Sequence, residues 1–283
     1  MNDDALSWAA TKIGPIARVR ELRGGWTSTM LALTPETGEE VVLRLMTKEP
    51  WRTHGEGLVT RESDVQQMLA ATTVPAPMSL ALDAAGEHCG VAAHLMTLVP
   101  GEVDIDRVDE VSLTQLADWL AAIHAVEPTI EIRRYQSWAW KEKFAVPPWA
   151  NQGHLWEDAF VLLGTEAPTY ERRMIHRDFQ HRNVLWCGEE ISGVVDWVET
   201  SIGPAWLDVA HCCTNIAISH GSQPAQAFAD AYVARTGCEP QPFYDVMDIV
   251  GFLPPPGRKG FVTGPVELAR LEDWLRNRIG LQA

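Results

Sequence analysis

The stretch MIHRDFQHRNVLW, residues 174–186, is the most informative part of the chain. Four polar or titratable side chains lie within eight residues of it, between apolar ends: His176, Asp178, His181 and Asn183. A short apolar run, ISGVV, follows and leads directly to Asp196. Such a density of polar groups beside apolar strand-like segments is typical of a functional site rather than of a solvated loop.

Two kinds of chemistry use residues of this type. The spacing His176-x-Asp178-x-x-His181 is that of metal ligands, so a hydrolytic metal centre is one interpretation. The remaining histidines form no second cluster in the sequence to complete it. The other interpretation is phosphoryl transfer from a nucleotide, in which Asp178 accepts the proton of a hydroxyl while Asn183 and Asp196 hold Mg²⁺. Hard oxygen ligands suit Mg²⁺, which favours the second interpretation.

The same residues resemble a known family. IHRDFQHRNVLW followed by GVVDW is similar to the H-x-D-x-x-x-x-N loop and strand end of the aminoglycoside phosphotransferase-like family. These small-molecule kinases include macrolide phosphotransferases and are distantly related to protein kinases. GPAWLDVAH resembles a later family segment and carries Asp208 at its acidic position. EVVLRL resembles the strand that carries a phosphate-binding base, here Arg44, and TRESDVQQML resembles its paired helix, with Glu62. The likeness runs in order over about residues 15–215.

The resemblance implies an α+β, bilobal protein-kinase-like fold with a small antiparallel-sheet lobe and a larger, mainly helical lobe. We expect an N-terminal nucleotide-binding lobe over residues 1–98 and a C-terminal lobe with the catalytic loop and acceptor site over 99–283. The hydrophobic patterns agree with this order. They predict strands near 18–24, 28–34, 39–46, 79–83, 90–99 and 191–195, helices near 58–69, 112–126, 204–220, 224–236 and 265–280, and an irregular, tryptophan-rich segment over 135–158.

The resemblance also implies the role of each site residue. Asp178 is the base, Asn183 and Asp196 hold Mg²⁺, and Arg44, braced by Glu62, holds a phosphate of ATP or GTP. Arginine replaces the lysine of many kinases, and its planar fork suits bidentate contacts. The turn RGGWTSTM departs from a G-x-G-x-x-G loop, and a plain hairpin explains its glycines equally well. Further nucleotide contacts are expected from that turn and from the hinge: Gly24, Gly25, Thr27, Ser28, Met96 and Leu98.

Several other polar residues are expected to be structural. The resemblance assigns His176 and Asp208 to the support of the catalytic loop. We expect His181 at the surface of that loop. His124 lies on the apolar face of its helix and is interpreted as a core histidine.

The acceptor is the least defined part of the prediction. Of the net charge of −15, −4 falls in residues 1–98 and −11 in the rest, and an acidic lobe suits a cationic aminoglycoside. The tryptophan-rich segment suits a bulkier, partly apolar acceptor such as a macrolide. Choline, homoserine or a sugar derivative are alternative acceptors, and a nucleotide-binding scaffold without activity is an alternative of another class. Acceptor contacts are expected from three acidic residues, Glu157, Asp158 and Glu199.

The composition limits the other possibilities. Binding to the phosphate backbone of a nucleic acid requires clustered Lys and Arg, and this acidic chain lacks such clusters. Nucleic acid is therefore not an expected partner. The sequence contains no apolar run of about eighteen residues, so a membrane span is not expected. Five cysteines without a C-x-x-C pair are typical of reduced thiols, and we expect a cytoplasmic, monomeric protein.

Overall fold

The structure is a computed structural model, and it describes residues 3–22 and 27–280. The chain forms two compact units, each with its own core. Unit 1 combines Met1–Glu102 with Leu185–Thr200, and unit 2 combines Val103–Val184 with Ser201–Ala283.

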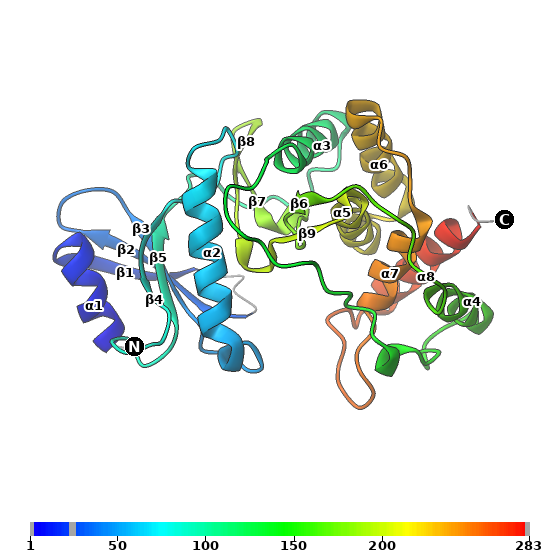
Figure 1. Cartoon of the computed structure of the whole chain (residues 1–283), viewed down its shortest axis with the longest axis horizontal. Coiled ribbons are helices and arrows are strands. Elements are labelled where there is room, and N and C mark those ends of the chain that lie inside the picture. Colours follow the sequence, from blue (N-terminus) through cyan, green and yellow to red (C-terminus); the bar gives the residue numbers. More distant parts are fainter. Residues whose placement is uncertain (1–2, 23–26, 281–283) are drawn as a thin grey trace. The chain divides into compact units, whose positions relative to one another are not determined.

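Unit 1 contains an antiparallel sheet, a hairpin and two long helices (Figure 1). Its elements are α1 Asp3–Ile13, β1 Ile16–Leu22, β2 Thr29–Pro35, β3 Val41–Leu45, η1 Trp51–His54, α2 Gly55–Leu69, β4 Ser79–Asp83, β5 Ala93–Thr97, β7 Val184–Cys187, β8 Glu190–Val194 and η4 Trp197–Glu199. Unit 2 is mainly helical. Its elements are α3 Glu110–His124, η2 Lys141–Lys143, α4 Gly153–Leu163, β6 Arg173–Ile175, η3 His181–Asn183, β9 Ser201–Gly203, α5 Ala205–His220, α6 Ser222–Thr236, α7 Pro242–Gly251 and α8 Pro265–Ile279.

The five-stranded sheet of unit 1 has the order β1-β2-β3-β5-β4, with antiparallel neighbours. Its strands alternate their side chains between two faces. Leu43 and Leu45 of β3 join the apolar cluster that includes Trp8 of α1. Arg44 lies between them in sequence and therefore points to the other face, where it is in register with His94 of β5. The alternation thus delivers one arginine and one histidine to the face that α2 covers.

The β7–β8 hairpin belongs to unit 1 although it follows the catalytic-loop sequence of unit 2. Trp186 of β7 pairs with Glu102, and the Val194 N–H donates to the carbonyl of Pro75 at 2.7 Å. A Cβ on Gly193 would lie 2.3 Å from Val99 Cγ1, so the hairpin packs closely on the segment after β5. The predicted division at residue 98 placed 185–200 in the second lobe, and these backbone contacts are the reason that they pack elsewhere.

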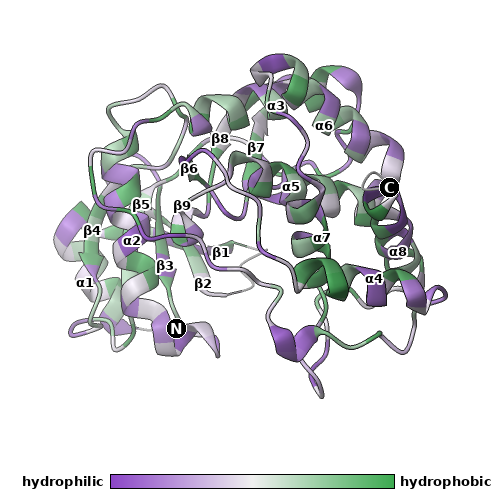
Figure 2. Cartoon of the chain, turned by 45° about the vertical axis from the view of Figure 1, so that its right-hand side comes forward, coloured by the Kyte–Doolittle hydropathy of each residue, from purple (hydrophilic) through white to green (hydrophobic). Residues whose placement is uncertain are grey.

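Unit 2 is built around α5, in which residues 206–218 are all buried. Helices α6, α7 and α8 pack on it, and the outer helices are amphipathic. Figure 2 shows hydrophilic and hydrophobic residues alternating along α3 and α6. Strands β6 and β9 form a short antiparallel pair just before and after the stretches that carry the polar motifs.

The predicted mixture of an antiparallel-sheet part and a helical part is confirmed, and strands β1–β5 and helices α2, α3, α5, α6 and α8 fall in the expected ranges. Helices α1 and α7 were not predicted. The irregular segment 135–158 was wrongly extended, because α4 begins at Gly153. Its buried positions Leu155, Trp156 and Ala159 form a short helical stripe that adjoins the proline-containing loop.

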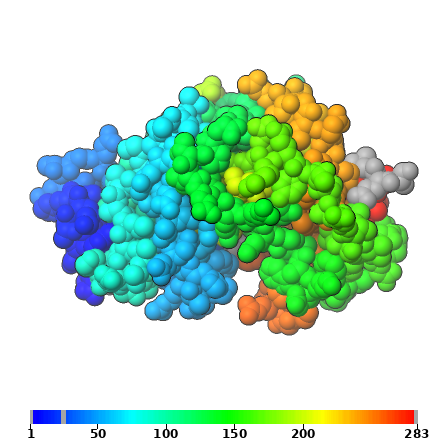
Figure 3. Space-filling model, viewed as in Figure 1, coloured from blue at the N-terminus to red at the C-terminus, as the bar shows by residue number. Residues whose placement is uncertain are grey.

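Three further findings bear on the predictions. No helix in the described ranges is long and apolar enough to cross a bilayer. All five cysteines are free thiols in the structure. The loop of residues 252–264 between α7 and α8 projects from unit 2, as Figure 3 shows by its orange atoms, and Phe261 on it is 63% exposed.

Candidate functional site

An ionic cluster lies on the α2 face of the unit 1 sheet. Arg44 Nε is 3.1 Å from Glu62 Oε2, and Arg44 Nη1 is 3.0 Å from Asp196 Oδ1. His94 Nδ1 is 3.0 Å from the same Glu62 oxygen, and its Nε2 is 3.0 Å from Ser79 Oγ. The structure therefore brings together three residues that the sequence had assigned to one site, from β3, α2 and the segment after β8.

Burial shapes the charges of this cluster. Burial alone would raise the pKa of Glu62, but the charge of Arg44 and the bond from His94 outweigh it and lower that pKa. Burial likewise opposes the charge of Arg44, and Asp196 with Glu62 raises its pKa above the usual value. Both side chains are therefore ionised at neutral pH, and the pair is an almost fully buried salt bridge.

Asp196 has an unusual backbone. Its φ of 70° and ψ of 59° lie in the left-handed region, which residues with a Cβ seldom adopt. Its side chain is 27% exposed. Backbone strain of this kind is concentrated at functional sites, where the surrounding structure maintains it.

The loop of residues 176–183 in unit 2, which the sequence predicts to be catalytic, is held by Asp208 of α5. Asp208 Oδ2 accepts from the His176 N–H at 2.7 Å, and Oδ1 accepts from the Arg177 N–H at 2.8 Å. His124 Nε2 lies 3.1 Å from Oδ2 and its Nδ1 lies 2.7 Å from Tyr232 Oη, so His124 is a satisfied core histidine, as expected. Burial would raise the pKa of Asp208, but these donors lower it. An ionised, buried carboxylate thus fixes the loop, including Arg177 at a φ of 71°.

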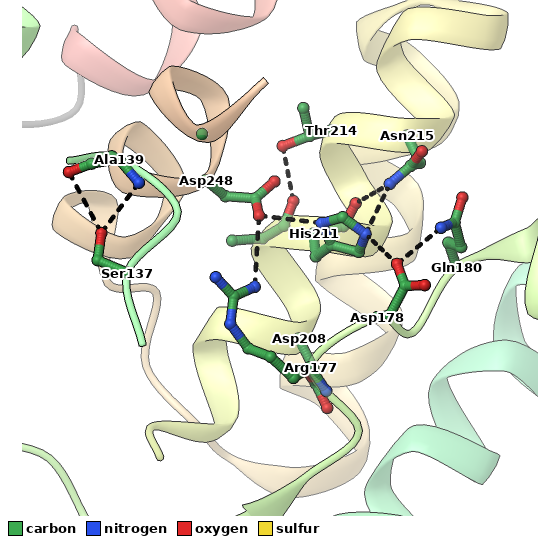
Figure 4. Close-up of polar contacts among 12 residues, drawn as sticks. Ser137, Ala139, Arg177, Asp178, Gln180, Asp208, His211, Thr214, Asn215 and Asp248 are labelled. Atoms are coloured by element: carbon green, nitrogen blue, oxygen red, sulfur yellow. Dashed lines mark hydrogen bonds and ion pairs between the residues drawn. The ribbon is translucent and has the colours of Figure 1, made fainter. Parts of the chain in front are cut away.

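Both oxygens of Asp178 accept hydrogen bonds within unit 2, and Figure 4 shows the two contacts of Oδ1. Oδ1 accepts from Gln180 Nε2 at 2.8 Å and faces His211 Nε2 at 2.9 Å. Oδ2 accepts from Asn183 Nδ2 at 3.0 Å. The Asp178 side chain is 24% exposed, so a ligand can reach it. Burial raises its pKa, but the bond and charge of His211 outweigh this and lower it, so that the carboxylate is ionised at neutral pH.

The residues assigned to Mg²⁺ fit a hard cation in their donor atoms. Asn183 donates both of its hydrogen bonds through Nδ2, to the carbonyl and to Oδ2 of Asp178, which orients its amide oxygen away as an acceptor. Asp196 contributes a partly exposed carboxylate. These are oxygen ligands of the kind that Mg²⁺ prefers. Over residues 3–22 and 27–280, no group of three or more His, Cys, Asp or Glu is arranged to hold a metal ion.

The sequence matches a family model over residues 18–242, and that model describes the phosphotransferase enzyme family. The chain belongs to this family. The resemblance found from the motifs is thereby confirmed, over a longer range than the motifs themselves cover. No curated protein matches the chain in sequence.

Solved structures with the same fold include members with antibiotic substrates. A candidate aminoglycoside phosphotransferase of Ralstonia eutropha has a TM-score of 0.69 and 16% identity, with 99% of this chain and 97% of that chain covered. Aminoglycoside phosphotransferase APH(4)-Ia has a TM-score of 0.65 and 16% identity, with 99% and 98% covered. Macrolide 2'-phosphotransferase MphH of Brachybacterium faecium has a TM-score of 0.64 and 18% identity, with 88% and 91% covered. At these identities the likeness establishes the fold.

The residues predicted to contact the nucleotide lie in the segment before β2, on β5 and in the hinge that follows β5. Gly24 and Gly25 lie outside the described residues. Ser28 is buried just before β2, and Thr27 beside it is half-buried. Met96 of β5 is buried and its sulfur accepts from Gln66 Nε2 of α2, while the hinge residue Leu98 is half-buried. Their contact with a nucleotide stays a prediction.

The predicted acceptor contacts are carried by different units. Glu157 and Asp158 are exposed on α4 of unit 2. Glu199 is half-buried on η4 of unit 1. Their role toward an acceptor stays a prediction.

The expected surface position of His181 is wrong, because its side chain is only 1% exposed. The 3-10 turn η3 directs it inward against α5, beside His220, and exposes Arg182 instead. Burial, together with the charge of Arg182, lowers the pKa of His181 to about 3, so the ring is neutral. A buried, uncharged imidazole has no part in acid–base chemistry at neutral pH.

Three polar residues of these clusters were not predicted: His94 of unit 1, and His211 and Asp248 of unit 2. His94 is fully buried beneath Glu62. His211 is in contact with Asp178, and Asp248 is in contact with His211. Each lies in an apolar stretch of sequence. A polar residue in such a stretch indicates a buried polar contact, because a buried polar group requires a partner.

Proposed function

We propose that the protein transfers the γ-phosphoryl group of a nucleotide to a hydroxyl group of a small molecule, in a reaction that depends on Mg²⁺. The observation that carries the proposal is the hydrogen bond of 3.0 Å between Asn183 Nδ2 and Asp178 Oδ2. This bond pairs the accessible, ionised carboxylate of Asp178 with the amide of Asn183, whose oxygen points away from that carboxylate and can accept a cation. This is the pairing of base and metal ligand that phosphoryl transfer requires.

The proposed step gives each of the assigned groups a role. Asp178 accepts the hydroxyl proton of the acceptor while the hydroxyl oxygen bonds to the γ-phosphorus. The bond from that phosphorus to the β–γ bridging oxygen breaks, and the nucleoside diphosphate leaves. Arg44, kept in place by Glu62, contacts the phosphates of the donor. Mg²⁺, held by Asn183 and Asp196, would neutralise the negative charge that develops on the leaving oxygen.

We propose an antibiotic as the acceptor, of the aminoglycoside type or a macrolide. Relatives of the same fold support this class: one structure of APH(4)-Ia is a ternary complex with ADP and hygromycin B, at 17% identity and a TM-score of 0.63. Another contains AMP-PNP and hygromycin B. These complexes also support an adenine nucleotide as the donor.

The test is an assay of nucleoside diphosphate release with Mg²⁺ and ATP or GTP over a panel of acceptors. The panel contains aminoglycosides, macrolides, choline and homoserine. We expect release that one acceptor class stimulates, with mass spectrometry showing that acceptor heavier by one phosphoryl group. Tight binding of Mg²⁺-nucleotide without release for any acceptor would favour the scaffold alternative, and the absence of nucleotide binding would refute the proposal.

Replacing the base gives a sharper form of the same test. We expect Asp178→Asn to lower kcat by about 10²–10⁴-fold, the usual contribution of a general base, with little change in nucleotide affinity. Asp230→Asn, an exposed aspartate on α6, is the matched control and is expected to keep wild-type kcat. Normal turnover by the Asp178 variant would contradict its assignment as the base.

A further inference from the structure

An imidazole lies between two carboxylates directly behind the base. His211 Nε2 is 2.9 Å from Asp178 Oδ1, and His211 Nδ1 is 3.0 Å from Asp248 Oδ1 (Figure 4). Exposure decreases along this row, from 24% for the Asp178 side chain to 5% for His211 and 0% for Asp248. Only the aspartate at one end is therefore accessible to a substrate, and the two inner groups have no role in surface solubility.

The ring of His211 is held on its faces and edges as well as at its nitrogens. Phe252 stacks on it with 5.7 Å between centroids and an interplanar angle of 22°. Trp138 meets it edge-on at 5.3 Å and 80°. Asn215 Nδ2, one turn further along α5, donates to the His211 carbonyl at 2.9 Å. The rotamer of this histidine is thus fixed by packing from the loop before η2, α5 and the end of α7.

The charges around His211 favour its protonated form. Burial alone would lower the pKa of the imidazole, but Asp248 and Asp178 outweigh it and raise that pKa to about 9. At neutral pH the ring is an imidazolium with two N–H donors, one for each carboxylate. The other titratable or charged groups that face this row include His176 and Arg177 of the loop, His181 of η3, Lys143 of η2, Cys212 and Cys213 of α5, and Asp245 of α7.

The hydrogen bonds also distinguish the two oxygens of Asp178. Oδ1 receives two donors, from Gln180 and His211, whereas Oδ2 receives one, from Asn183. A carboxylate oxygen has about two lone-pair sites. Oδ1 is therefore saturated, and the remaining acceptor site is on Oδ2.

We propose that His211, oriented by Asp248, is a positioning residue that fixes the carboxylate of Asp178 so that Oδ2 faces the acceptor hydroxyl. This inference rests on the proposed function, since Asp178 is the base only if the protein is a kinase. His211 itself transfers no proton to or from the substrates. It holds the rotamer of the base and keeps that carboxylate ionised.

The inference is tested with three variants on the acceptor found for the wild-type protein. His211→Phe keeps an aromatic ring between Phe252 and Trp138 but removes both donors. His211→Gln restores one N–H for Asp178 but not the link to Asp248, and Asp248→Asn removes the charge while keeping an acceptor for Nδ1. We expect kcat to fall by about 10–100-fold in His211→Phe, as for the loss of other supporting partners, and less in the two others. The KM for nucleotide is expected to stay within about twofold.

The pH profile separates positioning from general damage to the fold. In the wild type, kcat is expected to fall as the pH rises through about 9, since the imidazole then keeps one N–H and releases one carboxylate. His211→Gln is expected to lose this alkaline fall. His220→Gln, on the same helix and bonded to the Ile105 carbonyl, is the matched control and should keep both the rate and the profile. The alkaline fall persisting in His211→Gln would overturn the inference.

The outcomes for rate distinguish this inference from the proposed function. An active wild type with normal kcat in folded His211→Phe overturns the positioning role and leaves the kinase assignment intact. An inactive wild type over the whole acceptor panel overturns both. Two results together support the inference. One is a larger fall in kcat in His211→Phe than in His211→Gln, and the other is a ring-nitrogen resonance that shows His211 protonated at pH 7 in the wild type.

Discussion

Asp245 of α7 is a buried acid with a high pKa, and the stability of the protein should reveal it. Its side chain is 1% exposed, and Oδ1 accepts from Trp206 Nε1 at 2.9 Å. Burial raises the pKa from its ordinary value of 3.8 to about 7, because Arg278 and the indole N–H offset only part of the lost hydration, and Asp248 adds repulsion. The folded protein therefore binds this proton more strongly than the unfolded chain does.

The sign and size of the effect follow from this difference. Below about pH 4 both states are protonated, and Asp245 imposes no penalty. Between about pH 4 and 7 the unfolded chain ionises while the folded protein keeps its proton, so the free energy of unfolding falls as the pH rises. Above about pH 7 both are ionised and the loss is constant. A rise from 3.8 to about 7, at ~1.4 kcal/mol for each tenfold change in acidity, corresponds to a loss of about 4 kcal/mol.

The variant Asp245→Asn removes the ionisation and keeps a carbonyl oxygen for the indole N–H of Trp206. Urea unfolding of wild type and variant from pH 4 to 8 measures both stabilities. We expect the variant to gain about 4 kcal/mol relative to wild type between those limits, whatever the offset at pH 4. Asp230→Asn, at an exposed position of α6, should follow the wild-type curve. Parallel curves for Asp245→Asn and wild type would refute the argument that the folded protein keeps this carboxyl protonated between about pH 4 and 7.

Two further predictions concern packing in unit 1. Glu62→Gln leaves its buried arginine partner short of one charge and should cost ~3–5 kcal/mol in unfolding free energy. Glu40→Gln, in a more exposed ion pair of the same unit, should cost ~0–1 kcal/mol, and equal small effects would contradict the importance of burial. Gly193→Ala places a Cβ 2.3 Å from Val99 Cγ1 and should cost ~1–3 kcal/mol by denaturant unfolding, while Gly57→Ala, in open space on α2, should stabilise by ~0.5–1 kcal/mol. Val99→Ala should restore part of the loss in the first of these glycine variants, and no restoration would mean that the clash is elsewhere.

Local spacing explains why much of the site was accessible from the sequence. Asp178 and Asn183 lie five residues apart in one short loop, and the turn of that loop brings their side chains to 3.0 Å. Arg44 lies within an apolar strand, where alternation determines its face. Glu62 follows at a helical position on the element that covers that face. The resemblance to a family adds the expectation that Arg44 and Glu62 pair with each other.

The supporting residues were missed because their contacts are distant in sequence. His211 lies 33 residues from Asp178, and Asp248 lies 37 residues from His211, on two helices that no local rule places side by side. Their common signal is chemical. His211 stands in a helix whose residues 206–218 are all buried, and Asp248 stands in the apolar run VMDIV of α7. A charged group inside an apolar run indicates a buried partner, although not which one.

The two clusters use buried carboxylates in the same way. In unit 1, Arg44 has two acidic partners, and only one of them, Asp196, is partly exposed. In the proposed function Asp196 binds the cation, so Arg44 needs a partner that stays behind, and Glu62 is that partner because His94 and the sheet bury it. In unit 2, Asp178 meets the acceptor, and Asp248 stays behind to hold His211. In each case a buried carboxylate holds the cationic side chain that contacts the accessible carboxylate, and removal of the buried acid should therefore impair the accessible one.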